Sequence, residues 1–496
     1  MGWRAALERV SARAAVRACT CPLAAAAPRR KRACHEAEGG RARFEGAVLH
    51  STQRTLRGRW LGVWRHMAAA VAGAHERSER RLRQLGASLR ATACGSPLAP
   101  RPADGSPPEV LRVGFAGVHR SVITGNGSWP SNSHNWAAAF AGSADTRFTV
   151  VGVYDNAAST RNEFVRVWAE RAGWSVPAYG DFDEMLREAN LDILVVGTRQ
   201  TYHSSQIVRA IQAGVRGIAC DKPLVTRLSE MDEILEAFDA ASSAGQPVAF
   251  AYGTELRWDE AYQTLRQIIE SGAIGDVTSI TANGVGDCIN HGSHWYDAML
   301  MLLGDPMALW AAGTLVDTSG MAEDDWHRGD PPPLAAHVAL DNGAVLTMLG
   351  KGAGSHLTLN VVGRKGRLDI TNDSMAPSRG GTHATLYLDA PPHVASSVGT
   401  TLQGRGSSPP VSMPVPLAVH DSSDPWPRGG RIAADLLDAT RSGGTRSTLC
   451  GVEHARASTE IGFAIQESHQ NGGGRVTLPV KGRAAGVVVD SRPWGN

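Results

Sequence analysis

Two glycines and a carboxylate have the spacing of a nucleotide-binding turn. Gly114 and Gly117 close a short apolar run, and Asp155 follows a second apolar run. In a doubly wound sheet, a dinucleotide places its pyrophosphate at the tight turn after the first strand, while a carboxylate ending the second strand holds ribose hydroxyls. The usual G-x-G-x-x-G spacing is broken, because His119 stands at the next glycine position. We therefore expect a dinucleotide-type turn with an altered glycine loop.

The altered loop leaves two interpretations open. Between Gly117 and a helical pattern that begins near Trp136 lies the run Gly125-Asn-Gly127-Ser-Trp-Pro130. This run is either a relocated glycine loop or a surface excursion. A Rossmann-like sheet without a cofactor would show the same strands, so this motif alone does not decide between them.

A lysine and a histidine farther along the chain could perform proton chemistry. Lys222 is one of only five lysines and precedes a proline at the end of an apolar run, and His294 stands four residues after Asn290. An imidazole accepts a proton from a hydroxyl near neutral pH, and an ammonium beside the same oxygen stabilises a developing alkoxide. His294 could instead be a satisfied histidine at a helix start.

The sequence predicts no metal site. His291, His294 and Asp297 have i, i+3, i+6 spacing, which spreads the last member round a helix. Cys220, Cys288 and Cys450 are too widely separated for a zinc site or a disulfide framework. This cysteine usage favours a reducing compartment.

The elements that must position these residues alternate between strand and helix. Such alternation calls for a parallel sheet covered on both faces, so we predict an α/β Rossmann domain over residues 110–254. The predicted strands lie at Val110–Phe115, Phe148–Tyr154, Asp192–Gly197, Gly217–Ala219 and Pro247–Tyr252. The predicted helices lie at Asn162–Ala172, Phe182–Glu188, His203–Ala213 and Ser229–Ser242.

After Thr254 the pattern changes to that of an α+β domain, predicted over residues 255–485. Alternating apolar runs flank Asp341-Asn-Gly343 and Gly363-Arg-Lys-Gly366, which indicates hairpins and a largely antiparallel sheet. Residues 376–430 are rich in Pro, Ser and Gly and are expected to be a long surface insertion. A final helix pair is expected at Ile432–Arg441 and Val452–Ser468.

The net charge of +2 conceals two different segments. Residues 1–109 carry 20 basic and 8 acidic side chains, whereas residues 110–496 carry 30 and 40. The acidic main body gives no support for a nucleic-acid partner. We expect residues 1–109 to be a basic Ala/Arg-rich leader, either disordered or a targeting segment such as an organellar transit peptide. No stretch is long and apolar enough to span a membrane.

An ordered set of motifs resembles the Gfo/Idh/MocA oxidoreductases, the family of glucose-fructose oxidoreductase and inositol 2-dehydrogenase. The set begins with Val195-Val-Gly-Thr198-Arg-Gln-Thr-Tyr-His203 and continues with Ile218-Ala-Cys-Asp221-Lys222-Pro223. It ends with Asn290-His-Gly292-Ser-His294-Trp-Tyr-Asp297. The resemblance covers about residues 110–480, and the order of the motifs is far more specific than any one of them.

The resemblance implies roles for individual residues. Lys222 and His294 correspond to the catalytic lysine and histidine of the family, and His203 is expected to border the nicotinamide, unless it is a helix-start histidine facing solvent. Thr198 and Asp221 belong to the cofactor-binding motifs. Two positions depart from the family pattern. Asn290 replaces an aspartate and would position substrate or His294 without adding charge, and Asp221 replaces a glutamate.

The cofactor predicted from these motifs is NAD. Asp155 should repel a 2′-phosphate and accept ribose hydroxyls, which favours NAD over NADP. Arg161, six residues later, could still pair with a phosphate, so NADP remains open.

Taken together, the motifs predict an oxidoreductase that moves a hydride between a nicotinamide and a sugar-like or polyol hydroxyl. The alternatives are a non-catalytic Rossmann-type binding or regulatory protein, and an NAD-dependent glycosidase. We expect a small-molecule substrate, no nucleic-acid or membrane partner, and a cytoplasmic protein, with an organellar location if the leader is a transit peptide. The resemblance implies a homodimer or homotetramer.

Overall fold

The structure is a computed structural model. It describes residues 109–122, 134–320, 329–350, 357–372, 381–388, 411–417 and 427–480. Residues 1–108 of the predicted leader and the run Gly125–Pro130 lie outside these residues.

Six parallel strands form the first sheet, in the order β3-β2-β1-β4-β5-β6. The central strand β4 is buried along its whole length, as expected for a parallel sheet that is covered on both faces. The sequence had predicted five of these strands, and the sixth, β3, has only two residues. The strands are β1 (Leu111–Ala116), β2 (Phe148–Tyr154), β3 (Ala178–Tyr179), β4 (Ile193–Val196), β5 (Gly217–Cys220) and β6 (Ala249–Tyr252).

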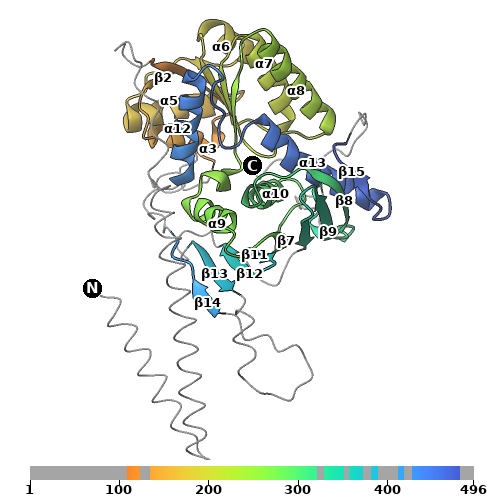
Figure 1. Ribbon diagram of the computed structural model, residues 1–496. Helices are drawn as coiled ribbons and strands as arrows, with labels where there is room; N and C mark the ends of the chain where they lie inside the picture. Colours follow the sequence, from red (N-terminus) through yellow and green to blue (C-terminus); the bar gives the residue numbers. More distant parts are fainter. Residues whose placement is uncertain are drawn as a thin grey trace, which may run out of the picture. The chain divides into compact units, whose positions relative to one another are not determined.

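Helices cover both faces of this sheet. They are α3 (His119–Val122), α4 (Trp136–Ala141), α5 (Ala158–Ala172), α6 (Phe182–Glu188), α7 (Gln200–Gln212) and α8 (Leu228–Ser243). Figure 1 shows α7 and α8 to one side of the sheet and α5 to the other. The rings of Phe164 and Trp168 in α5 pack with Phe115 in β1 and with Trp174, and the ring centroids of the two stacked tryptophans lie 5.1 Å apart.

A second sheet of nine strands has the order β14-β13-β12-β11-β7-β10-β9-β8-β15. Only the pairing of β7 with β10 is parallel. The predicted fold class, a parallel Rossmann sheet followed by a largely antiparallel one, is therefore confirmed. The strands are β7 (Val277–Asn283), β8 (Ala308–Leu315), β9 (Pro333–Leu340), β10 (Val345–Leu349), β11 (Leu357–Gly363), β12 (Gly366–Asn372), β13 (Thr382–Leu388), β14 (Val411–Pro414) and β15 (Val476–Thr477).

Two strands of this sheet lie where the sequence predicted a surface insertion. β13 pairs with β12 along seven residues, and β14 pairs with β13. Ala384 and Leu386 in β13 are buried, so an alternating strand pattern is present there. The sequence prediction missed this pattern because it relied on the high Pro, Ser and Gly content of the surrounding residues.

Further helices come from two parts of the chain, after β6 and after β14. These are the 3₁₀-helix η1 (Glu255–Trp258), α9 (Glu260–Glu270), α10 (Gly292–Leu302), α12 (Pro427–Arg441) and α13 (Val452–Gln470). The helix α10 is almost wholly buried, and α13 packs against it and against β8. Among the described residues, no helix has the length and apolar character that a membrane span requires.

The helix α12 returns to the first sheet. It packs against α4, β5 and β6. Arg441 at its end donates to Asp145 at 2.5 Å and to the Arg147 carbonyl at 2.6 Å. Its Nε also donates to the carbonyl of Glu109, whose carboxylate accepts from Arg216. The C-terminal segment thus helps to hold the Rossmann sheet, and the predicted domain limits at 254 and 255 remain a prediction.

Candidate active site

The predicted site residues stand where the parallel strands end. Gly117 donates to the Tyr154 carbonyl at the end of β2, and Gly197 donates to Ala116 at the end of β1. Asp221 in turn donates its backbone N–H to Val196 at the end of β4. These contacts bring the ends of four neighbouring strands to one edge, which is where doubly wound sheets bind ligands.

Gly117 is required by the geometry of the first turn. Its φ is +77°, and a Cβ built on it would lie 2.5 Å from the Thr198 backbone nitrogen. A larger residue would therefore meet both backbone strain and a backbone clash. Gly114 has a different role, because it lies within β1 and the space of its missing side chain is filled by Leu191. His119 is exposed at the start of α3, which has only four residues.

Asp155 ties the end of β2 to this turn. Its Oδ2 accepts from the Val118 N–H and its Oδ1 from the Ala157 N–H, both at 3.0 Å. A carboxylate oxygen can accept more than one hydrogen bond, so both oxygens could also accept from a ribose. Arg161 reaches back over the same strand end, where its Nη1 donates to the Asp155 carbonyl at 2.6 Å.

His203 lies inside the protein, and the alternative that it faces solvent is wrong. Its Nε2 lies 3.0 Å from the Thr198 carbonyl and its Nδ1 lies 3.1 Å from the Leu224 carbonyl. Burial lowers the pKa of the ring, and the contacts with the Thr198 and Leu224 carbonyls oppose this effect. The contacts join the loop after β4 to the loop after β5, and the Thr198 hydroxyl donates to Gln206 at 2.7 Å. His203 thus holds the segment that carries Lys222.

Asp221 is the centre of a buried charged group. His134 Nδ1 lies 2.8 Å from its Oδ1, Arg120 Nη1 lies 3.8 Å from its Oδ2, and the Lys222 N–H donates to Oδ1 at 2.7 Å. Burial alone would raise the pKa of Asp221, but His134 and Arg120 hold it well below its usual value. Asp221 is therefore a carboxylate at all ordinary pH values.

His134 is a site residue that sequence reasoning missed. It has a φ of +70°, a conformation that non-glycine residues adopt rarely and that occurs often at functional sites. Its ring also lies against His294, with 5.6 Å between the ring centroids. No sequence signal marks this position, because a positive φ and a contact across 160 positions are both products of the fold.

Lys222 connects the two sheets. It follows β5, and its Nζ donates to Oδ1 of Asn290 at 2.9 Å in the loop between β7 and α10. Burial lowers the pKa of Lys222. The negative charge of Asp221 opposes this effect, and other nearby charges contribute less. The structure therefore brings together Lys222 and Asn290, which lie 68 residues apart.

His294 lies in the first turn of α10, beside the same group. Burial holds the pKa of His294 well below its usual value, and the nearby charges of Lys222 and His134 lower it further. The ring is therefore neutral at pH 7 and can accept a proton. Asn290 therefore lies at the end of the loop before α10, and His294, four residues later, lies in the first turn of the helix.

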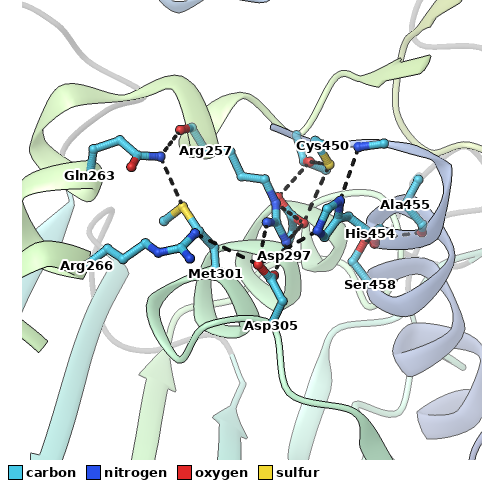
Figure 2. Close-up of polar contacts among 12 residues, drawn as sticks. Arg257, Gln263, Arg266, Asp297, Met301, Asp305, Cys450, His454, Ala455 and Ser458 are labelled. Carbon is cyan, nitrogen blue, oxygen red and sulfur yellow. Dashed lines mark hydrogen bonds and ion pairs between the residues drawn. The ribbon is translucent and has the colours of Figure 1, made fainter. Parts of the chain in front are cut away.

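Asp297 has a structural position rather than one beside Lys222. Its side chain is fully buried, and its Oδ1 accepts from Arg257 Nε at 2.8 Å while its Oδ2 accepts from Thr254 at 2.9 Å. Figure 2 shows Arg257 directed toward both Asp297 and Asp305, with His454 of α13 nearby. This ion-pair network anchors α10 to η1. The described residues include no group of three or more His, Cys, Asp or Glu side chains that could hold a metal ion.

The strand edge fits a dinucleotide. The absence of a Cβ at Gly117 lets two backbone segments approach closely, as a phosphate-binding turn requires. Asp155 stands at the end of the second strand, with its carboxylate directed at the same turn. The loop that would complete a phosphate site, residues 123–133, lies outside the described residues.

Comparisons with known proteins support this reading. Residues 119–249 match the GFO_IDH_MocA oxidoreductase family, described as having an NAD-binding Rossmann fold. The predicted resemblance to the Gfo/Idh/MocA oxidoreductases, and with it the nicotinamide-binding type of the Rossmann domain, is confirmed.

Similar curated proteins match over only part of this chain. The putative oxidoreductase YteT of Bacillus subtilis is 32% identical over 123 residues, which are 24% of this chain and 27% of that protein. Uncharacterized oxidoreductase C115.03 of Schizosaccharomyces pombe is 26% identical over 156 residues, 28% of this chain and 41% of that protein. The trans-1,2-dihydrobenzene-1,2-diol dehydrogenase of Bos taurus is 23% identical over 105 residues, 21% of this chain and 30% of that protein. Each match spans less than half of the relative.

Solved structures share the fold over both sheets. Levoglucosan dehydrogenase, in complex with NADH and levoglucosan, has a TM-score of 0.53 at 15% identity and covers 74% of this chain and 99% of its own. The aldose-aldose oxidoreductase of Caulobacter crescentus, complexed with glycerol, has a TM-score of 0.54 at 16% identity, with coverage of 74% and 99%. At this identity the likeness concerns the fold alone.

Proposed function

We propose that this protein is an NAD(P)-dependent oxidoreductase that transfers a hydride between a nicotinamide and a sugar-like or polyol hydroxyl. The observation that carries the proposal is the contact of Lys222 with Asn290 at the strand edge, together with the neutral ring of His294 beside it. An ammonium, an amide and an imidazole at one edge are the groups that oxidation of an alcohol needs.

His294 would act as the general base. Oxidation of a carbinol carbon releases a hydride and a hydroxyl proton, and the proton needs an acceptor within hydrogen-bond reach. Since burial and the charge of Lys222 depress the pKa of His294, the ring is unprotonated before the reaction. In the reverse direction the same nitrogen returns the proton.

Lys222 would stabilise the oxygen that becomes an alkoxide. Its ammonium carries only hydrogen-bond donors, one of which it gives to Asn290 in this structure. Because a fixed charge in a partly dry site costs no reorganisation during the reaction, this contribution is typically large. Asn290 accepts from Lys222 and keeps its ammonium directed into the site.

The nicotinamide cofactor, when bound, accepts or supplies the hydride. Gly117 and Asp155 would hold its pyrophosphate and adenosine ribose, and Thr198 and Asp221 would lie near its other end. Asp155 favours NAD. Arg161 is committed to the Asp155 carbonyl through one nitrogen only, so NADP remains possible.

The substrate class is proposed from the chemistry of the site and from the relatives. Similar structures include a levoglucosan dehydrogenase and a myo-inositol 2-dehydrogenase, both acting on hydroxyl-bearing rings by their names. The partner is then a small molecule, and we propose no nucleic-acid or membrane partner and a cytoplasmic or organellar location. Large apolar side chains remain exposed on the second sheet, which supports a homodimer or homotetramer; they include Met307, Leu309, Leu334, Leu349 and Val362.

Calorimetric titration of the full chain with NAD(H) and NADP(H) tests the proposal, followed by a panel of sugars and polyols in which nicotinamide reduction is measured. We expect tight binding of at least one cofactor and reduction with at least one polyol. Cofactor binding without turnover on any substrate would favour the non-catalytic alternative. Release of free sugar without net reduction would favour a glycosidase, and failure to bind either cofactor would refute both the oxidoreductase and the NAD-dependent glycosidase.

A further inference from the structure

Asp287 lies at the centre of the loop that carries Asn290. The loop joins β7 to α10 and contains two glycines with positive φ, Gly284 and Gly286. The Asp287 side chain is fully buried, and its backbone carbonyl accepts from the Gly292 N–H at 2.9 Å. Its carboxylate therefore cannot be explained as a solvated surface charge.

The Asp287 carboxylate connects two side chains of the site. Its Oδ2 accepts from Asn290 Nδ2 at 3.0 Å and lies 2.7 Å from His291 Nδ1. On the other side of the amide, Asn290 Oδ1 accepts from Lys222 Nζ at 2.9 Å. The three groups form a chain from a carboxylate through an amide to an ammonium.

This chain allows only one orientation of the Asn290 amide. A carboxylate only accepts hydrogen bonds, so it must face the NH₂ group, and an ammonium only donates, so it must face the oxygen. If the amide were turned over, both contacts would become repulsive. Asp287 thereby forces the amide oxygen toward Lys222.

We propose that Asp287 is a positioning residue of this site, which orients Asn290 toward Lys222 and supplies, one side chain farther out, the negative charge that Asn290 lacks. The proposal rests on the proposed function for its significance, since it completes the Lys222–Asn290–His294 site. It also explains how an amide can stand where the family resemblance expects an aspartate.

A separate carboxylate holds the backbone of the same loop. Asp330 accepts from the N–H groups of Ile289 and Asn290 at 2.7 to 3.0 Å, and Gln466 donates to it at 3.1 Å. Asp330 therefore positions the main chain, whereas Asp287 positions the side chains. Of these two carboxylates, Asp287 is the one that is connected to Lys222 through the Asn290 side chain.

The charge of Asp287 is one of several that act on Lys222. The charged groups that act on Lys222 include Asp221, Arg120, Asp287 and Glu255, and it acts in turn on His294, whose ring lies against His134. Asp221, Asp287 and Glu255 favour the charged ammonium, whereas burial and Arg120 oppose it. Removing the charge of Asp287 should therefore lower the pKa of Lys222 further.

The test is the pH dependence of acetylation of Lys222 by acetic anhydride in the full chain, measured by peptide mass. Only a deprotonated amine reacts, so the midpoint of the pH dependence of acetylation reports the pKa of the lysine. Because only five lysines are present, the peptide that carries Lys222 can be identified by its mass. We expect Asp287→Asn to lower this midpoint by about 0.5 pH unit or more. The double variant Asp287→Asn/Asn290→Asp, which moves the carboxylate into direct contact, should return it to the wild-type value or above.

The matched control is Asp276→Asn, which removes a carboxylate with 93% exposure and should leave the midpoint unchanged. An unchanged midpoint in Asp287→Asn, at an unchanged unfolding temperature, would overturn the proposal. If that variant does not fold, the double variant decides, since a midpoint well below the wild-type value in the double variant would also overturn it. Because acetylation uses no cofactor or substrate, this result is independent of whether the chain transfers hydride.

Discussion

At the scale of single residues, the site depends on pairs of groups whose protonation is set by their neighbours. His294 is neutral because of burial and the charge of Lys222, while Asp221 is ionised because His134 and Arg120 outweigh its burial. Lys222, Asp221, Asn290 and His294 could be predicted from the sequence, because each stands in a recognisable motif. His134 and Asp287 could not, because their importance comes from contacts that folding creates.

Asp330 should make the stability of the protein depend on pH. Burial raises the pKa of Asp330 to about 7, and the nearby Asp287 carboxylate raises it as well. The folded chain then keeps a proton that the unfolded chain releases, so the contribution of this group is complete below about pH 4 and is lost as the pH rises through about 7. The unfolding free energy of the wild type minus that of Asp330→Asn should fall across this range, by at most about 1.4 kcal/mol per pH unit.

Urea unfolding at a series of pH values measures this difference. Asp276→Asn serves as the control, because it removes a carboxylate that is 93% exposed rather than buried. If the unfolding free energies of the wild type and Asp330→Asn changed with pH in parallel, the pKa of Asp330 would be the same in the folded and unfolded chain, and the prediction would be wrong.

At the scale of elements, the short segments between regular structures position the site. The loop between β7 and α10 carries Asp287, Asn290 and His291, and η1 carries Arg257, which anchors α10. Helices such as α6 matched their predicted limits because their caps and apolar spacing are local. The strands β3, β13 and β14 were missed, since each is short or is surrounded by Pro, Ser and Gly.

Breaking the anchor of α10 should destabilise the protein strongly. In Arg257→Met the buried carboxylate of Asp297 loses its ion-pair partner, and removing one member of a buried pair typically costs about 3–5 kcal/mol. Urea unfolding followed by circular dichroism measures the change. Arg166→Met is the control, because Arg166 pairs with Glu163 at the surface and its loss should leave the midpoint unchanged. Equal midpoints for the two variants would contradict the assigned role of Arg257.

At the scale of the whole molecule, the site lies between two sheets that the sequence places in different segments. The carboxyl edge of the first sheet supplies Lys222 and Asp221, and the loop before α10 supplies Asn290 and His294. The two sheet types followed from strand periodicity and turn residues, so the fold class could be predicted. The packing of α12 against the first sheet could not be predicted, because an amphipathic pattern shows that a helix has an apolar face but not which surface that face contacts.

Removal of residues 1–108 should leave the protein folded and able to bind its cofactor. Every contact described for the site lies within residues 109–480, and Glu109 must be kept because Arg216 and Arg441 bind it. We expect the truncated chain to have the same urea midpoint and a dissociation constant for NADH within about threefold. Loss of folding or of cofactor binding would show that the basic segment is part of the folded unit.

Transfer of deuterium tests the central claim most directly. The full chain is incubated with NAD⁺ and a sugar or polyol that is deuterated at the reacting carbon, and the nicotinamide product is examined by mass spectrometry. The account predicts deuterium in the reduced nicotinamide of the wild type, and a rate at least about 100-fold lower in Lys222→Met, with NAD⁺ binding retained. Equal transfer rates in the two proteins, or no transfer by a wild type that binds both NAD⁺ and polyol, would contradict it.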